Sequence, residues 1–105
     1  MAAEQGDANA QFRLGEFYRK GIYNVVVRDK KAALKWYRLA AEQGDGRAQT
    51  NLGLMYDKGK GVPQDDQEAV KWYQLAADRG LTKAQEKLNF LLKNKVSESF
   101  QGNSK

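Results

Sequence analysis

The chain has 105 residues, of which 41% are hydrophobic and 30% charged, and its formal net charge is +5. This length predicts one domain, and the composition excludes a disordered chain. Cysteine and histidine are both absent, which excludes a disulfide framework and removes the commonest general base and metal ligand. We therefore expect no enzyme active site, no metal and no cofactor. No apolar run approaches the roughly 18 residues of a membrane helix, so we expect no membrane span.

Five segments carry apolar residues at helical spacing, with polar signals at their ends. In chain order, the predicted helices cover 7–20, 29–43, 45–58, 65–79 and 82–94, so the expected fold class is all-α. Aspartates stand at the expected N-caps of the first four helices, at Asp7, Asp29, Asp45 and Asp65, where a carboxylate accepts from free backbone N–H groups. Glu68 follows Asp65 by three residues and predicts an acidic variant of the capping box.

The helices belong to an internal repeat. The stretch from Gly6 to Gly21 recurs from Gly44 to Gly59, an offset of 44 − 6 = 38, and the second helix recurs at an offset of 80 − 44 = 36. The two extra residues of the first unit fall in the loop before Asp29. We predict units at about 6–43 and 44–79, a half unit at 80–94, and a disordered tail at 97–105.

Glycine occupies the same position inside the first helix of both units, at Gly15 and Gly53. Glycine there costs about 1 kcal/mol relative to alanine, so we expect a close approach by a bulky residue of the second helix. The candidates are the Trp-Tyr pairs at 36–37 and 72–73. Such pairs could stack on bases in a basic protein, but their recurrence opposite the glycines favours core packing. Asn89 replaces the glycine in the third copy.

Together these residues spell A-Q-x-x-L-G-x-x-Y-x-x-G, then G-V-x-x-D, K-A or E-A, and W-Y-x-x-A-A-x-x-G. This pattern resembles the Sel-1-like repeat (SLR), a relative of the tetratricopeptide repeat, over residues 6–94. The resemblance implies a superhelical solenoid over 1–96, built of antiparallel helix pairs. It also implies a non-enzymatic scaffold or adaptor for protein interaction, of a kind common in bacteria. Cysteine-rich family members with a proposed enzymatic role have no counterpart here. The first unit departs from the pattern where 23–27 replace the Gly-Val turn.

By analogy with tetratricopeptide arrays, the first helix of each pair lines a concave groove. We predict that this groove binds a peptide or helix of another protein, with apolar anchors and with acidic residues or a C-terminal carboxylate. Arg19, Arg47 and Lys58 would be the charge partners. The candidate residues are Phe12, Glu16, Arg19, Lys20, Arg47, Leu54, Asp57, Lys58 and Phe90. Further residues expected on this surface are Asn9, Thr50, Lys83, Glu86, Lys93 and Asn94. Phe12 and Phe90 could instead pack on adjoining helices.

Several alternatives stay open at this stage. The basic surface could bind nucleic acid or another polyanion, although its bases are interleaved with 13 acids, which makes the field diffuse. Two carboxylates, such as Glu16 and Asp57, could form an acid and base pair. The apolar loop residues Tyr23 and Val25 could form a second contact surface, and Val26 is expected to anchor the turn. The N-terminal helix face could support self-association. The compartment is undetermined, either cytoplasmic or periplasmic for a bacterial protein.

Overall fold

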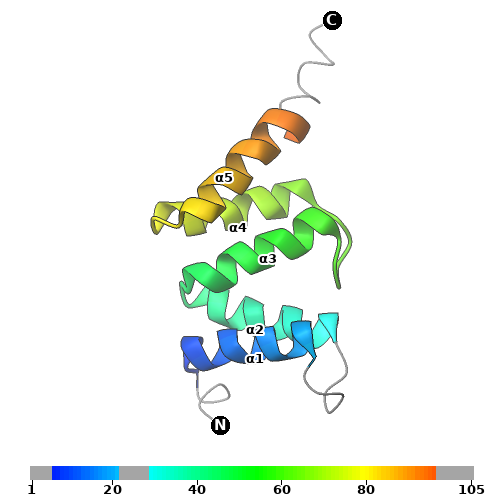
Figure 1. Ribbon diagram of the computed structural model, residues 1–105, viewed down its shortest axis with the longest axis vertical. Helices are drawn as coiled ribbons and strands as arrows, with labels where there is room; N and C mark the ends of the chain where they lie inside the picture. The colour runs from blue at the N-terminus through cyan, green and yellow to red at the C-terminus, as the bar shows by residue number, and fades with distance from the viewer. Residues whose placement is uncertain (1–5, 22–28, 97–105) are drawn as a thin grey trace, which may run out of the picture.

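The computed structural model describes residues 6–21 and 29–96. Within these ranges the chain is helical, and its helices follow one another along the long axis of the molecule (Figure 1). They are α1 (Ala8–Lys20), α2 (Lys30–Glu42), α3 (Gly46–Lys58), α4 (Asp66–Asp78), α5 (Thr82–Leu91) and the π-helical segment η1 (Leu92–Val96). The all-α prediction is confirmed, and the first four helices differ from the predicted bounds by at most one residue at either end. The last helix was predicted to continue to 94, but its α-helical part ends at Leu91.

The aspartate caps are confirmed. Asp7 Oδ1 accepts from the Ala10 N–H at 3.0 Å, and Asp29 Oδ1 accepts from the Ala32 N–H at 3.0 Å. Asp45 and Asp65 each accept from two N–H groups in the first turn of their helices. The start of α5 differs, because its N-cap residue is Leu81, which has no side-chain acceptor.

The predicted capping box forms only in part. Asp65 accepts from the Glu68 N–H, but the Glu68 carboxylate does not complete the box in return. It accepts instead from Trp72 Nε1 at 3.2 Å. The Asp65 N–H donates to the carbonyl of Tyr56 at 2.9 Å, so the donor that the box would have satisfied already has a partner.

The two glycines inside the first helices lie against tyrosines. An added Cβ would lie 2.6 Å from Tyr37 Cδ1 at Gly15 and 2.6 Å from Tyr73 Cδ1 at Gly53. Both tyrosines are fully buried. The predicted close approach is therefore confirmed, and the tyrosine of each Trp-Tyr pair makes it.

The two tryptophans differ in how deeply they are buried. Trp72 is 4% exposed and joins a core with Leu52 and Met55 of its own unit and residues of α2. Trp36 holds the matching position in the first unit but is only half-buried. Core packing is confirmed fully for Trp72 and partly for Trp36, because the cluster that buries Trp72 includes residues of α2 from the preceding unit.

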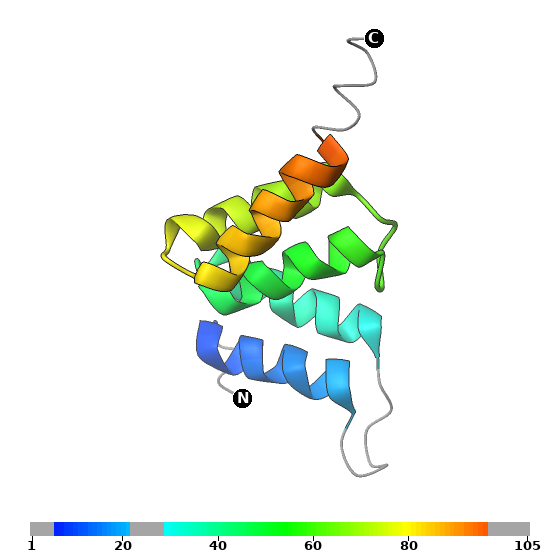
Figure 2. The same cartoon turned by 45° about the horizontal axis from the view of Figure 1, so that its top comes forward.

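Each helix packs against its neighbours in the chain, so α1 lies on α2, α2 on α3, α3 on α4 and α4 on α5. Both views show this order, with α5 crossing in front of α4 (Figures 1 and 2). The loop predicted to differ between the units, residues 22–28, lies outside the described residues, as do Tyr23, Val25 and Val26, and so does the tail 97–105. The same backbone hydrogen bond joins the two helices within each unit, α1 to the start of α2 and α3 to the start of α4. The Asp29 N–H donates to the Tyr18 carbonyl, as Asp65 does to Tyr56, both at 2.9 Å.

Candidate functional site

In the part of the chain that the structure describes, surface pockets lie along the first helices of the repeats, and three of them are described below. The α1/α3 pocket, about 300 Å³, is lined by Phe12, Glu16, Arg19, Arg47, Thr50, Asn51, Leu81 and Lys83. The α3/α5 pocket, about 360 Å³, is lined by Asp57, Lys58, Glu86, Lys87 and Phe90. The α1 pocket, about 380 Å³, is lined by Phe12, Arg13, Glu16, Phe17, Lys20 and Arg47. We call the surface that carries these pockets the groove face.

The sequence prediction and these pockets overlap closely. Every candidate residue except Leu54 lines at least one pocket, and Leu54 is half-buried on α3. Sequence reasoning missed Phe17, which lines the α1 pocket, and one whole repeat position, which holds Arg13, Asn51 and Lys87. This position is polar in all three copies and precedes the predicted groove positions 16, 54 and 90 by three residues. That polar stripe at helical spacing was the signal that could have found it. No repeat signal marks Leu81, which enters from the α4–α5 link.

Glu16 is the polar centre of the first unit. It accepts from Arg19 Nε at 2.9 Å, from the Tyr37 hydroxyl, and from Asn51 Nδ2 at 3.4 Å, and it lies 3.5 Å from Lys20 Nζ. Burial alone would raise the pKa of Glu16, but the hydrogen bonds from Arg19 and Tyr37 and the nearby positive charges lower it below its usual value. A carboxyl held ionised in this way is a poor general acid.

In the second unit a different repeat position supplies the hydrogen-bond acceptor for the buried tyrosine. The Tyr73 hydroxyl donates to Asp57 Oδ2 at 3.1 Å. Asp57 matches Arg19 in the repeat, and the residue that matches Glu16 is Leu54. The pKa values of Tyr37 and Tyr73 are both raised, mainly by burial and to a lesser extent by the neighbouring carboxylate. Each tyrosine therefore remains a protonated donor, and Glu16 and Asp57 are its structural partners, which argues against the acid and base pair.

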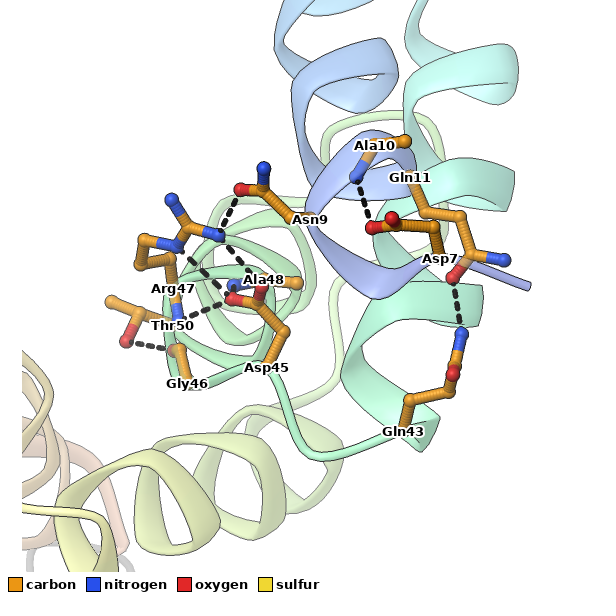
Figure 3. A network of polar contacts seen from close by, with 10 residues as sticks. All are labelled: Asp7, Asn9, Ala10, Gln11, Gln43, Asp45, Gly46, Arg47, Ala48 and Thr50. Atoms are coloured by element: carbon orange, nitrogen blue, oxygen red, sulfur yellow. Dashed lines mark hydrogen bonds and ion pairs between the residues drawn. The ribbon is translucent and has the colours of Figure 1, made fainter. Parts of the chain in front are cut away.

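Arg47 links the two units at the edge of the α1/α3 pocket. Its Nη2 donates to Asn9 Oδ1 of α1 at 2.8 Å and to Asp45 Oδ2 at 2.8 Å, and its Nε donates to Asp45 Oδ1 at 3.3 Å (Figure 3). The guanidinium carbon lies 4.2 Å from the centre of the Phe12 ring. Asp45 thus caps α3 and holds the arginine at the same time.

The two groove phenylalanines differ in their surroundings. Phe12 packs on Tyr37, with ring centroids 5.9 Å apart, and also lies under Arg47. The open alternative of packing on adjoining helices is therefore confirmed for Phe12, although its ring still lines a pocket. Phe90 is 63% exposed at the α3/α5 pocket. An exposed aromatic side chain at a pocket is a candidate contact for a partner.

The rest of the described structure offers no metal site, since no group of three acidic side chains in 6–21 and 29–94 is close enough to hold an ion. None of the described helices has the length and apolarity to cross a membrane. The described arrangement is that of an α-helical solenoid with pockets along its first helices.

Comparison with known proteins gives the family. A family model described as Sel1 repeat matches residues 8–45 and 46–81. The chain is 41% identical to a Sel1 repeat protein from Oxalobacter formigenes, with a TM-score of 0.82, over 86% of this chain and 25% of that one. The chain therefore belongs to the Sel1 repeat family, and the predicted SLR resemblance is confirmed.

Two further solved structures are similar. The protective antigen c5321 of uropathogenic Escherichia coli, which displays an SLR fold, is 45% identical with a TM-score of 0.76, over 80% of this chain and 18% of that one. The cysteine-rich protein B of Helicobacter pylori is 32% identical with a TM-score of 0.75, over 81% of this chain and 62% of that one. The chain thus spans less than two thirds of each of these three proteins. A search of curated proteins finds no match.

Proposed function

We propose that this chain is a non-enzymatic scaffold module whose groove face binds a segment of another protein, an extended peptide or a helix. Sel1 repeats are generally protein–protein interaction modules. The observation that carries the proposal is the α3/α5 pocket, where Phe90 is 63% exposed beside Lys58 and Lys87. Aromatic anchors within a polar rim are characteristic of protein-binding surfaces.

The charge distribution favours a protein partner over nucleic acid. Arg19, Lys20 and Arg47 are each within ion-pair distance of an acid of this chain. The α3/α5 pocket places Asp57 and Glu86 beside its two lysines. A phosphate backbone running along the groove face would therefore meet fixed negative charge at one end, which weakens polyanion binding.

The test is a comparison of two variants of equal charge change. The groove variant carries Lys58→Glu, Lys83→Glu and Phe90→Ser, all at exposed sites of the groove face. The control variant carries Lys31→Glu, Lys35→Glu and Leu75→Ser, all at exposed sites of the second helices. Both should show helical circular dichroism like that of the original chain.

We expect particular proteins captured by the original chain and the control variant to be lost by the groove variant. Equal capture by both variants would move the site away from the groove face. Binding of a duplex oligonucleotide with steep salt dependence, lost in the groove variant, would instead support the polyanion alternative.

A further inference from the structure

The α1/α3 pocket contains an arginine that is held in place before any partner binds. Two bonds to Asp45 and Asn9 fix Nη2 of Arg47, a third fixes Nε, and the ring of Phe12 supports the guanidinium face. The remaining terminal nitrogen, Nη1, makes none of these bonds (Figure 3). The side chain is still 49% exposed. An arginine positioned in this way offers two N–H donors with little further loss of side-chain entropy.

A second arginine in the same pocket is positioned by similar means. Arg19 uses only Nε to reach Glu16 at 2.9 Å and the Tyr37 hydroxyl at 3.0 Å, and its two terminal nitrogens take no part in these bonds. Lys83 adds a third positive charge at the start of α5. Two acids face these three bases: Glu16 in the pocket lining, which already accepts from Arg19, Tyr37 and Asn51, and Asp45 at the pocket edge, which pairs with Arg47. The pocket therefore keeps an excess of positive charge.

The pocket walls and the neighbouring pocket define the kind of ligand further. Phe12 and Leu81 give the α1/α3 pocket two apolar walls, and its volume of about 300 Å³ suits one side chain and adjoining main chain. In the α3/α5 pocket the charges of Asp57 and Glu86 balance those of Lys58 and Lys87. A matching ligand is acidic at one end only and apolar beyond it.

We infer that the α1/α3 pocket binds a carboxylate of the partner segment on Arg47 Nη1, with Arg19 adding positive charge from the same pocket and with an apolar neighbour of that residue on Phe12 and Leu81. This inference rests on the proposed function and names the chemistry of its partner, an acidic segment that ends or continues in apolar residues. A planar guanidinium matches a carboxylate in geometry, and a charge-assisted bond of this type is about twice as strong as a neutral one. Asn9 and Asp45 are positioning residues for Arg47.

The direct test uses a defined probe. A blocked tripeptide of glutamate, leucine and phenylalanine is titrated into the ¹⁵N-labelled chain, and the side-chain N–H signals of the arginines are followed by NMR. The same peptide with glutamine in place of glutamate is the matched control. We expect saturable shifts of the Arg47 and Arg19 signals at millimolar concentration with the acidic peptide, and binding at least several-fold weaker with the glutamine peptide.

Variants separate the arginine's geometry from its charge. Arg47→Lys keeps the charge but loses the fork and the support of Asn9, so we expect affinity for the acidic peptide to fall about tenfold. Arg13→Lys is the matched control on the same surface, outside this pocket, and should change affinity less than about twofold. Asn9→Ala should weaken binding by an intermediate factor while the helical signal stays unchanged.

Three outcomes would overturn the inference. Equal binding by Arg47→Lys and the original chain would show that the arginine fork does not hold the carboxylate. Inorganic phosphate that shifts both arginine signals and competes with the peptide at equal affinity would show a general anion site. Peptide shifts confined to the surroundings of Phe90 would refute the carboxylate pocket and leave the proposed groove function standing.

Discussion

In the first unit the hydroxyl of the buried Tyr37 is hydrogen-bonded to Glu16 and Arg19. In the second unit the Tyr73 hydroxyl is bonded to Asp57, which lies three residues after the position that matches Glu16. This difference in hydrogen-bond partner does not change how the two helices of a unit pack, because both tyrosines are buried against a glycine. It changes what the groove face presents, since Leu54 stands where the first unit has Glu16. Positions that pack one helix on its partner are thus the same in both units, and positions beside them are free to define a ligand.

The two tryptophans, which hold matching positions in the two units, differ in burial. Trp72 is 4% exposed in the core between units, and Trp36 is half-buried. We expect Trp72→Ala to lower the free energy of unfolding by about 3–5 kcal/mol, as for other buried aromatic truncations, and Trp36→Ala to cost no more than about half as much. Urea unfolding followed by circular dichroism measures both. Equal losses would contradict the view that packing on α2 of the preceding unit buries Trp72.

The glycine positions test the feature that the two units share. Alanine at Gly53 gains about 1 kcal/mol of helix propensity but places a Cβ 2.6 Å from the ring of Tyr73. That ring is fully buried and its hydroxyl is bonded to Asp57, so it cannot move without cost. We expect Gly53→Ala to destabilise by about 1–2 kcal/mol overall, and Gly15→Ala to do the same.

Asn89 provides the control for this prediction, because it holds the glycine position in α5 and is exposed. Asn89→Ala should leave stability unchanged or raise it by a few tenths of a kcal/mol, because the gain in helix propensity outweighs or offsets loss of the exposed bond from Gln85 Nε2 to Asn89 Oδ1. A stabilising effect at Gly53 and Asn89 alike would show that the tyrosine contact does not require glycine.

The carboxylate of the first unit predicts a pH effect. The pKa of Glu16 is lower in the folded chain than its ordinary value of 4.5, since the bonds from Arg19 and Tyr37 and the nearby positive charges outweigh the effect of burial. A lowered folded pKa adds stability that is fully present above the unfolded value and is lost as the pH falls through the folded value. Glu16→Gln should therefore be less stable than the original chain at pH 7.

This difference should shrink as the pH falls below about 4.5. Urea unfolding at a series of pH values measures it, with Glu42→Gln, at an exposed site in the last turn of α2, as the control for loss of one acidic charge. A difference between Glu16→Gln and the original chain that is the same at pH 3 and pH 7 would show that the ionised carboxylate adds no stability.

Much of the fold could be predicted from the sequence because its determinants are local and occur twice. A cap such as Asp29 is encoded within one helical turn, and the glycine at 15 and 53 points to a bulky partner at one repeat position. The tryptophans show where this reasoning ends. Trp36 and Trp72 each stand between a lysine and a tyrosine in the sequence but differ in burial, so repeat position alone could not predict that difference.

The helical register predicted which positions lie on the groove face, but it did not predict which hydrogen bonds their side chains form. The register identified Arg47 and Phe12, but the bond from Arg47 to Asn9 joins residues 38 positions apart. Leu81 lines the α1/α3 pocket from a link between helices, where no periodic pattern applies. Side-chain contacts between units depend on how the helices cross, which single-sequence patterns do not encode.

The smallest expected change in stability comes from separating the two roles of Asp45. Serine is as good an N-cap as aspartate, but its short side chain cannot reach the guanidinium of Arg47. We expect Asp45→Ser to cost less than about 1 kcal/mol, because Arg47 is half-exposed and such ion pairs contribute little. The side-chain N–H signal of Arg47 should nevertheless lose its order in NMR relaxation measurements.

Asp7→Ser is the matched control, because Asp7 caps α1 through the Ala10 N–H alone among the described contacts. It should leave both stability and the Arg47 signal nearly unchanged. An ordered Arg47 in Asp45→Ser would mean that Asn9 and Phe12 suffice to hold the guanidinium. Loss of that order, with the fold intact, would show that the residue that starts α3 also shapes the groove face, so that the cap position in each unit can tune binding at little cost in stability. The third copy of the repeat extends this contrast. There Leu81 replaces the cap Asp45 and Lys83 replaces Arg47, so the lysine has no cap carboxylate to hold it.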